Sequence, residues 1–167
     1  YEGGIREPMI ITWPGVVKPG SVCSKPVTST DFYPTMLEMA HLPLKPRQHI
    51  DGVSLVPFLK GMGKLKRKAI YWHYPHYHGS GNRPSGAVRA GDYKLIEWYE
   101  DNSIELYNLK NDIGEKDDLA AKMPKKAAEL RQLLHQWLKQ MKAKAPTSGP
   151  REDFKMWQSS RRKERQE

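Results

Sequence analysis

Three histidines lie close together near the middle of the chain, in a segment rich in aromatic residues. His73, His76 and His78 belong to residues 71–78, which read Tyr-Trp-His-Tyr-Pro-His-Tyr-His. Imidazole can ligate a metal, hydrogen bond to an anion, or satisfy a polar group inside a protein. The neighbouring aromatic rings can stack on the face of a sugar. This segment is therefore the best candidate in the chain for direct function.

Three interpretations of the segment remain open. As a metal site it offers three nitrogen ligands, but it has no acidic partner nearby. As structure, its aromatic rings pack at a sheet edge and its imidazoles take part in hydrogen bonds. As a substrate-recognition loop, it contacts a sugar or a second anionic group on that sugar. On this third interpretation we expect substrate contacts from His73 and His76, then Tyr77 and His78, with Arg83 and Arg89 as secondary anion contacts.

The sequence around the histidines predicts a small antiparallel sheet. Short runs rich in β-branched and aromatic residues are separated by tight turns, which is typical of a meander. The Ala-Gly-Asp at 90–92 indicates a hairpin, and residues 75–84 form a loop rich in Gly, Pro, Ser and His. The expected strands are residues 69–74, 86–89, 93–100 and 105–109.

A helix that begins at Pro124 is the clearest element of the chain. Its apolar residues recur at spacings of three and four, with Lys, Arg and Gln on the opposite face, which indicates one buried stripe. We expect this helix to cover one face of the meander. The stripe consists of Ala127, Leu130, Leu134, Trp137 and Met141.

The first 60 residues predict fewer regular elements. Residues 5–13 form a short apolar run closed by Pro14 and Gly15, which suits a buried strand. Asp31 is a favourable N-cap, so a helix is expected from Phe32 to about Ala40, burying Met36, Leu37 and Ala40.

The chain has 167 residues, enough for one modest domain, and a formal charge of +9 from 28 Lys and Arg against 19 Asp and Glu. Residues 122–144 carry seven basic residues against one Glu. Such a balance suits a polyanionic partner, nucleic acid, or a solvated helix face. No apolar run is long enough to span a membrane, and the first 20 residues lack a signal-peptide pattern. The single cysteine, Cys23, allows no internal disulfide and is expected to be a buried thiol.

Five segments, in order, resemble the carboxyl-terminal portion of the sulfatase family. The first is Tyr-Glu-Gly-Gly-Ile-Arg-Glu-Pro at 1–8, and the second is Asp-Phe-Tyr-Pro-Thr-Met-Leu at 31–37. Asp-Gly-Val-Ser-Leu at 51–55, Arg-Ala-Gly-Asp-Tyr-Lys-Leu at 89–95 and Glu-Leu-Tyr-Asn-Leu at 105–109 follow. One departure is His41, where the family often has a glycine. His41 must therefore adopt a left-handed conformation at some cost, or the helix ends differently.

The resemblance implies an alkaline-phosphatase-like α/β fold, of which this chain is a part. Residues 1–60 would supply the last strand and helix of the catalytic domain. Residues 65–142 would form the C-terminal subdomain, a four-stranded antiparallel sheet with a packed helix. Residues 143–167 would be a basic polar tail.

The resemblance also implies chemistry that this chain does not contain. Sulfatases hydrolyse aryl or carbohydrate sulfate esters with a formylglycine nucleophile and a calcium ion, and the first segment follows a catalytic lysine. Cys23 does not match the family's Cys-x-Pro-x-Arg motif, because Pro26 comes one place late and no arginine follows. We therefore predict no catalytic residue and no metal ligand here, and an isolated chain without activity. Glu2 and Arg6 would lie near the site, as support for the backbone.

The expected partners are a sulfated small molecule or sulfated carbohydrate, and the rest of the catalytic domain, with no nucleic acid and no membrane span. By resemblance the protein is periplasmic or secreted. The alternative is a non-catalytic basic module that binds sulfated glycan or nucleic acid. Against nucleic acid, the sequence shows no RNP, zinc-finger or helix-turn-helix pattern.

Overall fold

The computed structural model describes residues 1–62, 65, 67–79 and 81–146, which form two compact units. One unit combines Tyr1–Ile5 with the chain from Ala69 onward, and the other is Arg6–Lys68. The segment Tyr1–Ile5 thus belongs with the sheet, although residues 1–60 were expected to form one part. Most of the expected polar tail, residues 147–167, lies outside the described residues.

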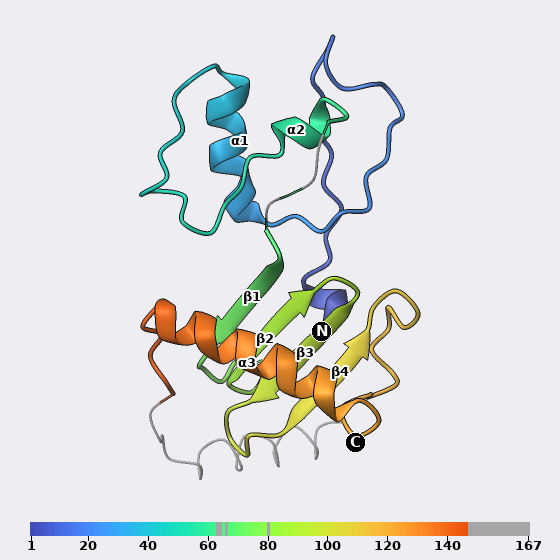
Figure 1. The fold of residues 1–167 in the computed structure, drawn as a ribbon, viewed down its shortest axis with the longest axis vertical. Helices are drawn as coiled ribbons and strands as arrows, with labels where there is room; N and C mark the ends of the chain where they lie inside the picture. The colour runs from blue at the N-terminus through green and yellow to red at the C-terminus, as the bar shows by residue number, and fades with distance from the viewer. Residues whose placement is uncertain (63–64, 66, 80, 147–167) are drawn as a thin grey trace. The chain divides into compact units, whose positions relative to one another are not determined.

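The sheet is the expected four-stranded antiparallel meander (Figure 1). Its strands follow one another in the order β1-β2-β3-β4, each paired with the next. Gly91 has a φ of 59° in the turn between β2 and β3, a conformation that glycine adopts without steric cost. The strands are β1 Ala69–Tyr74, β2 Ser85–Ala90, β3 Tyr93–Trp98 and β4 Ile104–Asn108.

Helix α3, Pro124–Gln140, covers one face of this sheet, as predicted (Figure 1). Alternate residues of a strand point to opposite faces, so Val88, Leu95 and Leu106 face the helix. They pack against Ala127, Leu130 and Leu134, and all six are almost fully buried. Tyr71 stacks on Trp137 with ring centroids 4.9 Å apart. Burial of each large apolar side chain contributes about 1.5–3 kcal/mol, which makes this interface the main core of the unit.

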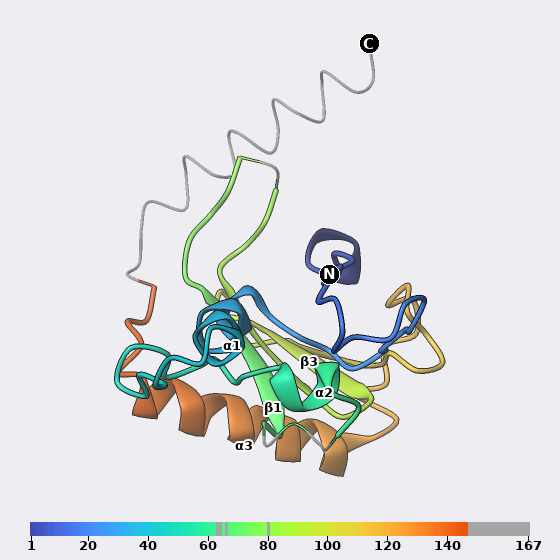
Figure 2. The ribbon, with the colours of Figure 1, turned by 90° about the horizontal axis from the view of Figure 1, so that it is seen from above.

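The Tyr1–Ile5 segment lies on the opposite face of the sheet. It contains a short 3-10 helix, η1 Glu2–Gly4, and the Tyr1 ring contacts Trp98 and Tyr107. Figure 2 shows α3 and the N-terminal segment on the two sides of the strands. The sheet is therefore covered on both faces by elements from distant parts of the sequence.

The Arg6–Lys68 unit is organised around the buried side chain of Asp31. Its carboxylate accepts hydrogen bonds from the backbone N–H groups of Thr28 and Val53, at 2.9 and 3.0 Å. It also binds the guanidinium of Arg67 through both oxygens, at 2.7 and 3.0 Å. Gly52 is required beside this site, because a Cβ there would lie 2.1 Å from the Thr30 carbonyl oxygen. The Asp31 and Asp-Gly segments of the family pattern thus meet in one place.

The helices of this unit are α1 Phe32–Met39 and α2 Val56–Leu59. The predicted span of α1 is confirmed, but its predicted buried face is wrong. Pro34 and Thr35 are buried, whereas Met36 is 60% exposed. The reason is that Thr35 accepts a hydrogen bond from the Leu55 N–H, so α1 packs through its first turn.

Three further predictions on this unit have clear outcomes. The strand expected at residues 5–13 is wrong: the segment is irregular, and Ile10 is 91% exposed. Strand hydrogen bonds need a neighbouring strand, and no described residue of this unit supplies one. Cys23 is exposed rather than buried. His41 does adopt the left-handed conformation, with φ 56°.

Candidate functional site

Four charged side chains meet on the face of the sheet that carries Tyr1–Ile5. Lys94 on β3 lies 2.9 Å from a carboxylate oxygen of Glu2 and 2.9 Å from one of Glu115. Arg89 on β2 lies 3.6 Å from the second oxygen of Glu2. The backbone N–H of Glu2 also donates to the Glu115 carboxylate. We call Glu2, Arg89, Lys94 and Glu115 the charge cluster.

The charge cluster is buried and balanced. The side chains of Lys94 and Glu115 are each 2% exposed, and that of Glu2 is 5% exposed. Two carboxylates and two cations offset one another, which is the condition under which ionised groups are tolerated out of water. The cluster ties the first turn of the chain to β2, β3 and the loop after β4, and so fixes where the Tyr-Glu-Gly-Gly segment lies.

The charge cluster was missed by sequence reasoning, which assigned Glu2 to backbone support and gave Lys94 no role. One signal was available: Lys94 stands between Tyr93 and Leu95 in a strand whose neighbours are apolar. A lysine at such a position must either reach solvent or find buried acids. Which acids it meets is not visible locally, because Glu2 is 92 residues away.

Aromatic residues continue this face beside the charge cluster. The Glu105 carboxylate accepts hydrogen bonds from the hydroxyls of Tyr1 and Tyr107 and from the Trp98 indole, at 2.9, 3.0 and 2.9 Å. Burial, then the hydrogen bond to Glu105 and the negative charge of Glu105, raise the pKa of Tyr1 to about 12 and raise that of Tyr107 as well. Both hydroxyls therefore stay protonated at neutral pH. They hold in place an aromatic wall made of Tyr1, Trp98 and Tyr107.

The candidate recognition loop, which follows β1, is anchored next to this wall. The Tyr77 hydroxyl donates to Glu100 at 2.8 Å, and Arg83 lies 3.4 Å from the same carboxylate. The Arg83 guanidinium also stacks over the Trp98 ring, 4.4 Å from its centroid. Arginine over tryptophan is a favourable cation–π arrangement. The loop thus presents a fixed guanidinium and an aromatic hydroxyl, groups suited to an anionic sugar.

The predicted site histidines occupy different surroundings. His73 is half-buried, with Nδ1 2.7 Å from the Tyr99 hydroxyl and Nε2 3.0 Å from the Lys144 carbonyl oxygen. Both ring nitrogens are thus engaged within the protein, which favours the structural interpretation for His73. His76 and His78 are exposed, and His76 packs edge-on against Tyr74. Among the described residues no three His, Cys, Asp or Glu side chains are grouped as a metal site would require.

The meander with one covering helix is the architecture expected of a sulfatase C-terminal subdomain. The chain belongs to the family described as N-sulphoglucosamine sulphohydrolase, C-terminal, whose profile matches residues 1–144. The expected fold class is confirmed, because sulfatases of known structure share this architecture at TM-scores of 0.61.

Three similar proteins define the context. A sulfatase of Formosa agariphila is 39% identical over 162 residues, which cover 88% of this chain and 29% of that protein. An N-acetylglucosamine-6-O-sulfatase of Bacteroides thetaiotaomicron is 38% identical over 154 residues, which cover 87% of this chain and 27% of that protein. A protein solved in complex with its substrate D-glucosamine-2-N,6-O-disulfate aligns with a TM-score of 0.69 and 36% identity. The alignment covers 82% of this chain and 29% of that protein. The chain therefore spans less than a third of the relatives it matches.

No helix within the described part of the chain is both long and apolar enough to cross a membrane.

Proposed function

We propose that this chain is the C-terminal part of a sulfatase that hydrolyses sulfate esters of carbohydrates. The observation that carries the proposal is the family match over residues 1–144, joined to relatives named for a sulfated glucosamine. In this proposal the chain supplies scaffold and substrate contacts, and the rest of the catalytic domain supplies the nucleophile. Aryl sulfates form the second substrate class to be tested, since human arylsulfatase A is 34% identical.

The substrate contacts in this proposal come from the loop after β1. His76, Tyr77 and His78 offer hydrogen-bond groups at an exposed loop, and Arg83 offers a positive charge held by Glu100 and Trp98. Imidazole and guanidinium groups bind sulfate and carboxylate oxygens, and the guanidinium does so through two parallel donors. His73, at the end of β1, anchors the start of this loop through its contacts with the Tyr99 hydroxyl and the Lys144 carbonyl.

Calcium is part of the proposal for the whole enzyme but not for this chain. Calcium prefers six to eight oxygen ligands, several of them carboxylates. The described residues fit no such site, because their buried carboxylates are already paired with Lys94, Arg67 and Arg131. We assign the calcium ligands to other parts of the whole protein. By resemblance to its family we also propose that the whole protein acts in the periplasm or outside the cell.

The proposal is tested by measuring sulfate release. The whole protein should release sulfate from 6-O-sulfated glucosamine, whereas chain 1–167 alone should release none from either substrate class. Whole protein that hydrolyses neither class would contradict the proposal. Turnover by the isolated chain would contradict the assignment of the nucleophile to other sequence.

A second measurement addresses the loop. His76→Ala in the whole protein should raise KM about 2- to 12-fold with little change in kcat, the loss of one hydrogen bond worth about 0.5–1.5 kcal/mol. His41→Asn is the matched control, because His41 is exposed in the other unit and asparagine tolerates its left-handed conformation. An unchanged KM for His76→Ala would remove that residue from the substrate site.

A further inference from the structure

The solvent-facing side of α3 and its end carries three exposed lysines and a single carboxylate, that of Glu129. Six exposed residues recur at helical spacing along it, and we call them the basic stripe: Lys125, Gln132, His135, Gln136, Lys139 and Lys142. Residues three, four or seven apart lie on one face of a helix, so the members from Lys125 to Lys139 share a face, and Lys142 follows just beyond the end of the helix. The row lies on the side of α3 that faces away from the sheet, with His135 at its edge, where the imidazole reaches Glu97 of β3.

Nearby acidic groups do not neutralise the basic stripe. Glu129 lies on the same face, four residues after Lys125, and its carboxylate pairs with Lys126 at 2.6 Å. Glu97 is buried under the helix, with a side chain 3% exposed, and pairs with Arg131 at 2.6 Å. No ion pair joins Lys125, Lys139 or Lys142 to a carboxylate within residues 1–146 as described. The row therefore keeps its positive charge toward solvent.

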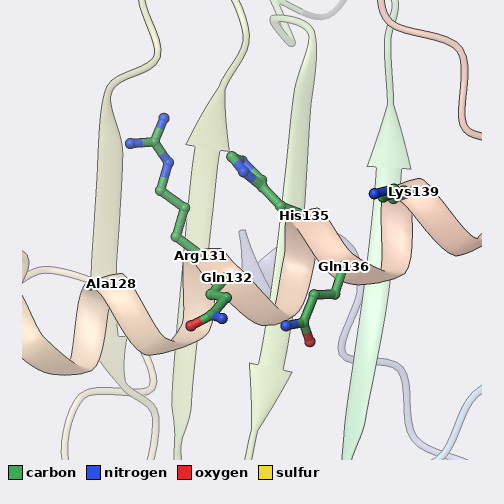
Figure 3. A pocket seen from close by; sticks show the side chains of 6 residues that line it. All are labelled: Ala128, Arg131, Gln132, His135, Gln136 and Lys139. Atoms are coloured by element: carbon green, nitrogen blue, oxygen red, sulfur yellow. The ribbon is translucent and has the colours of Figure 1, made fainter.

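The buried Glu97 also orients the middle of the stripe. Its carboxylate accepts from Nε and Nη2 of Arg131, at 3.0 and 2.6 Å, and lies 2.6 Å from Nε2 of His135. Arg131 and His135 consequently point to one side of the helix, while Gln132 and Gln136 point to the other (Figure 3). With Nε2 bound to Glu97, Nδ1 of His135 is left for an external hydrogen bond. The middle of the stripe thus combines an oriented imidazole with two exposed amides, groups that suit hydroxyls.

We propose that the basic stripe is a binding surface for a sulfated polysaccharide. Lys125 and Lys139 are 14 residues apart, which is about 21 Å along a helix at 1.5 Å per residue. That length exceeds a single sugar and suits several anionic groups of one polymer. The amides of Gln132 and Gln136 suit sugar hydroxyls. The stripe carries no aromatic ring on which bases could stack, unlike sites for single-stranded nucleic acid.

This inference goes beyond the proposed hydrolase function and does not depend on it. A polymer bound along α3 requires no turnover, so binding can be measured on chain 1–167 itself. Failure of sulfate release would leave the binding result unaffected, and failure of binding would leave the enzymatic assay unaffected.

The test compares two variants that each lose three positive charges. Lys125→Gln/Lys139→Gln/Lys142→Gln removes the lysines of the stripe. Lys18→Gln/Lys25→Gln/Lys45→Gln removes three exposed lysines of the Arg6–Lys68 unit. All six are at the surface, so both variants should fold, which circular dichroism checks. The stripe variant should bind heparin at least about tenfold more weakly and elute from immobilised heparin at lower salt, whereas the control should change less than about threefold.

Three results would overturn the inference. The first is equal loss of heparin affinity in both variants, which would show a general charge effect. The second is undiminished binding of chemically desulfated heparin by the unaltered chain. The third is stripe-dependent binding of DNA as tight as that of heparin, which would assign the surface to nucleic acid instead.

Discussion

Replacing Lys94 by methionine would remove the central cation of the charge cluster while keeping most of the side-chain volume. Lys94 lies 2.9 Å from each of two carboxylates, and its side chain is 2% exposed. After the replacement both carboxylates lose this cation, and Arg89 lies farther away, 3.6 Å from Glu2. Breaking a buried pair by removing one partner costs about 3–5 kcal/mol, because the remaining charge is left uncompensated. Small domains are stable by only about 5–15 kcal/mol, so the loss should be large.

The assay is urea unfolding of chain 1–167 followed by tryptophan fluorescence, since Trp72, Trp98 and Trp137 all lie in the unit that contains the cluster. Lys110→Met is the matched control, because Lys110 is exposed and should change the free energy of unfolding by less than about 0.5 kcal/mol.

A triple variant separates charge from packing. Glu2→Gln/Lys94→Met/Glu115→Gln also neutralises the two carboxylates that contact Lys94, and it should recover at least half of the stability that Lys94→Met loses. The reasoning is refuted if Lys94→Met unfolds within about 1 kcal/mol of the unaltered chain, or if the triple variant is no more stable than the single one.

Three further predictions follow from particular positions. Gly86→Ala should destabilise the sheet unit by about 1–3 kcal/mol, because the new Cβ would lie 2.3 Å from the Tyr99 hydroxyl oxygen. Gly79→Ala, which has open space, is its control, and equal thermal stability of the two variants would contradict the reasoning. His41→Gly should raise the free energy of unfolding by about 1 kcal/mol, because it relieves a left-handed residue with φ 56°; a fall would show that the imidazole makes a compensating contact. Burial raises the pKa of Tyr1 and Tyr99 from 10.0 to about 12. Their contribution to stability should therefore be complete below pH 10 and lost as pH rises from 10 to about 12, which unfolding at stepped pH with tyrosinate absorbance would show. Titration of Tyr1 and Tyr99 near pH 10 would contradict this prediction.

The sheet and its covering helix were predictable because their signals are local. Runs rich in β-branched and aromatic residues and the turn at residues 90–92 predicted strands that the structure places within two residues at each end. The apolar stripe of α3 correctly predicted the burial of Ala127, Leu130 and Leu134. The prediction was wrong for Met141, which is 40% exposed because the helix ends at Gln140, and Trp137 is half-buried. Each of these patterns depends only on neighbours in the chain, which the sequence displays directly.

The run at residues 5–13 shows where local reasoning fails. Apolar composition suggested a buried strand, but a strand exists only where another strand pairs with it. The same limit applies to Asp31, which looked like a helix cap. Its carboxylate instead binds Val53 and Arg67, 22 and 36 residues away.

The sequence indicated where the candidate recognition loop lies, but it did not show which contacts the side chains of the loop make. The spacing of its histidines left three interpretations open, and the contacts of His73 with Tyr99 and with the backbone of Lys144 became visible only in the structure. The aromatic wall on Glu105 and the Arg83–Trp98 stack were not foreseen, because both join side chains from different strands and loops.

The sequence by itself determined the family, the four strands, the last helix and the positive charge of its outer face. Each of these depends on short motifs, on the spacing of nearby residues or on composition. Only the tertiary structure decided which charges are buried together. Glu2 and Lys94 are 92 residues apart and pair at 2.9 Å because the meander brings β3 beneath the first turn of the chain. Residue identity sets what a group can do, but the free energy of a buried ion pair depends on a distance, and distances between remote residues arise only on folding.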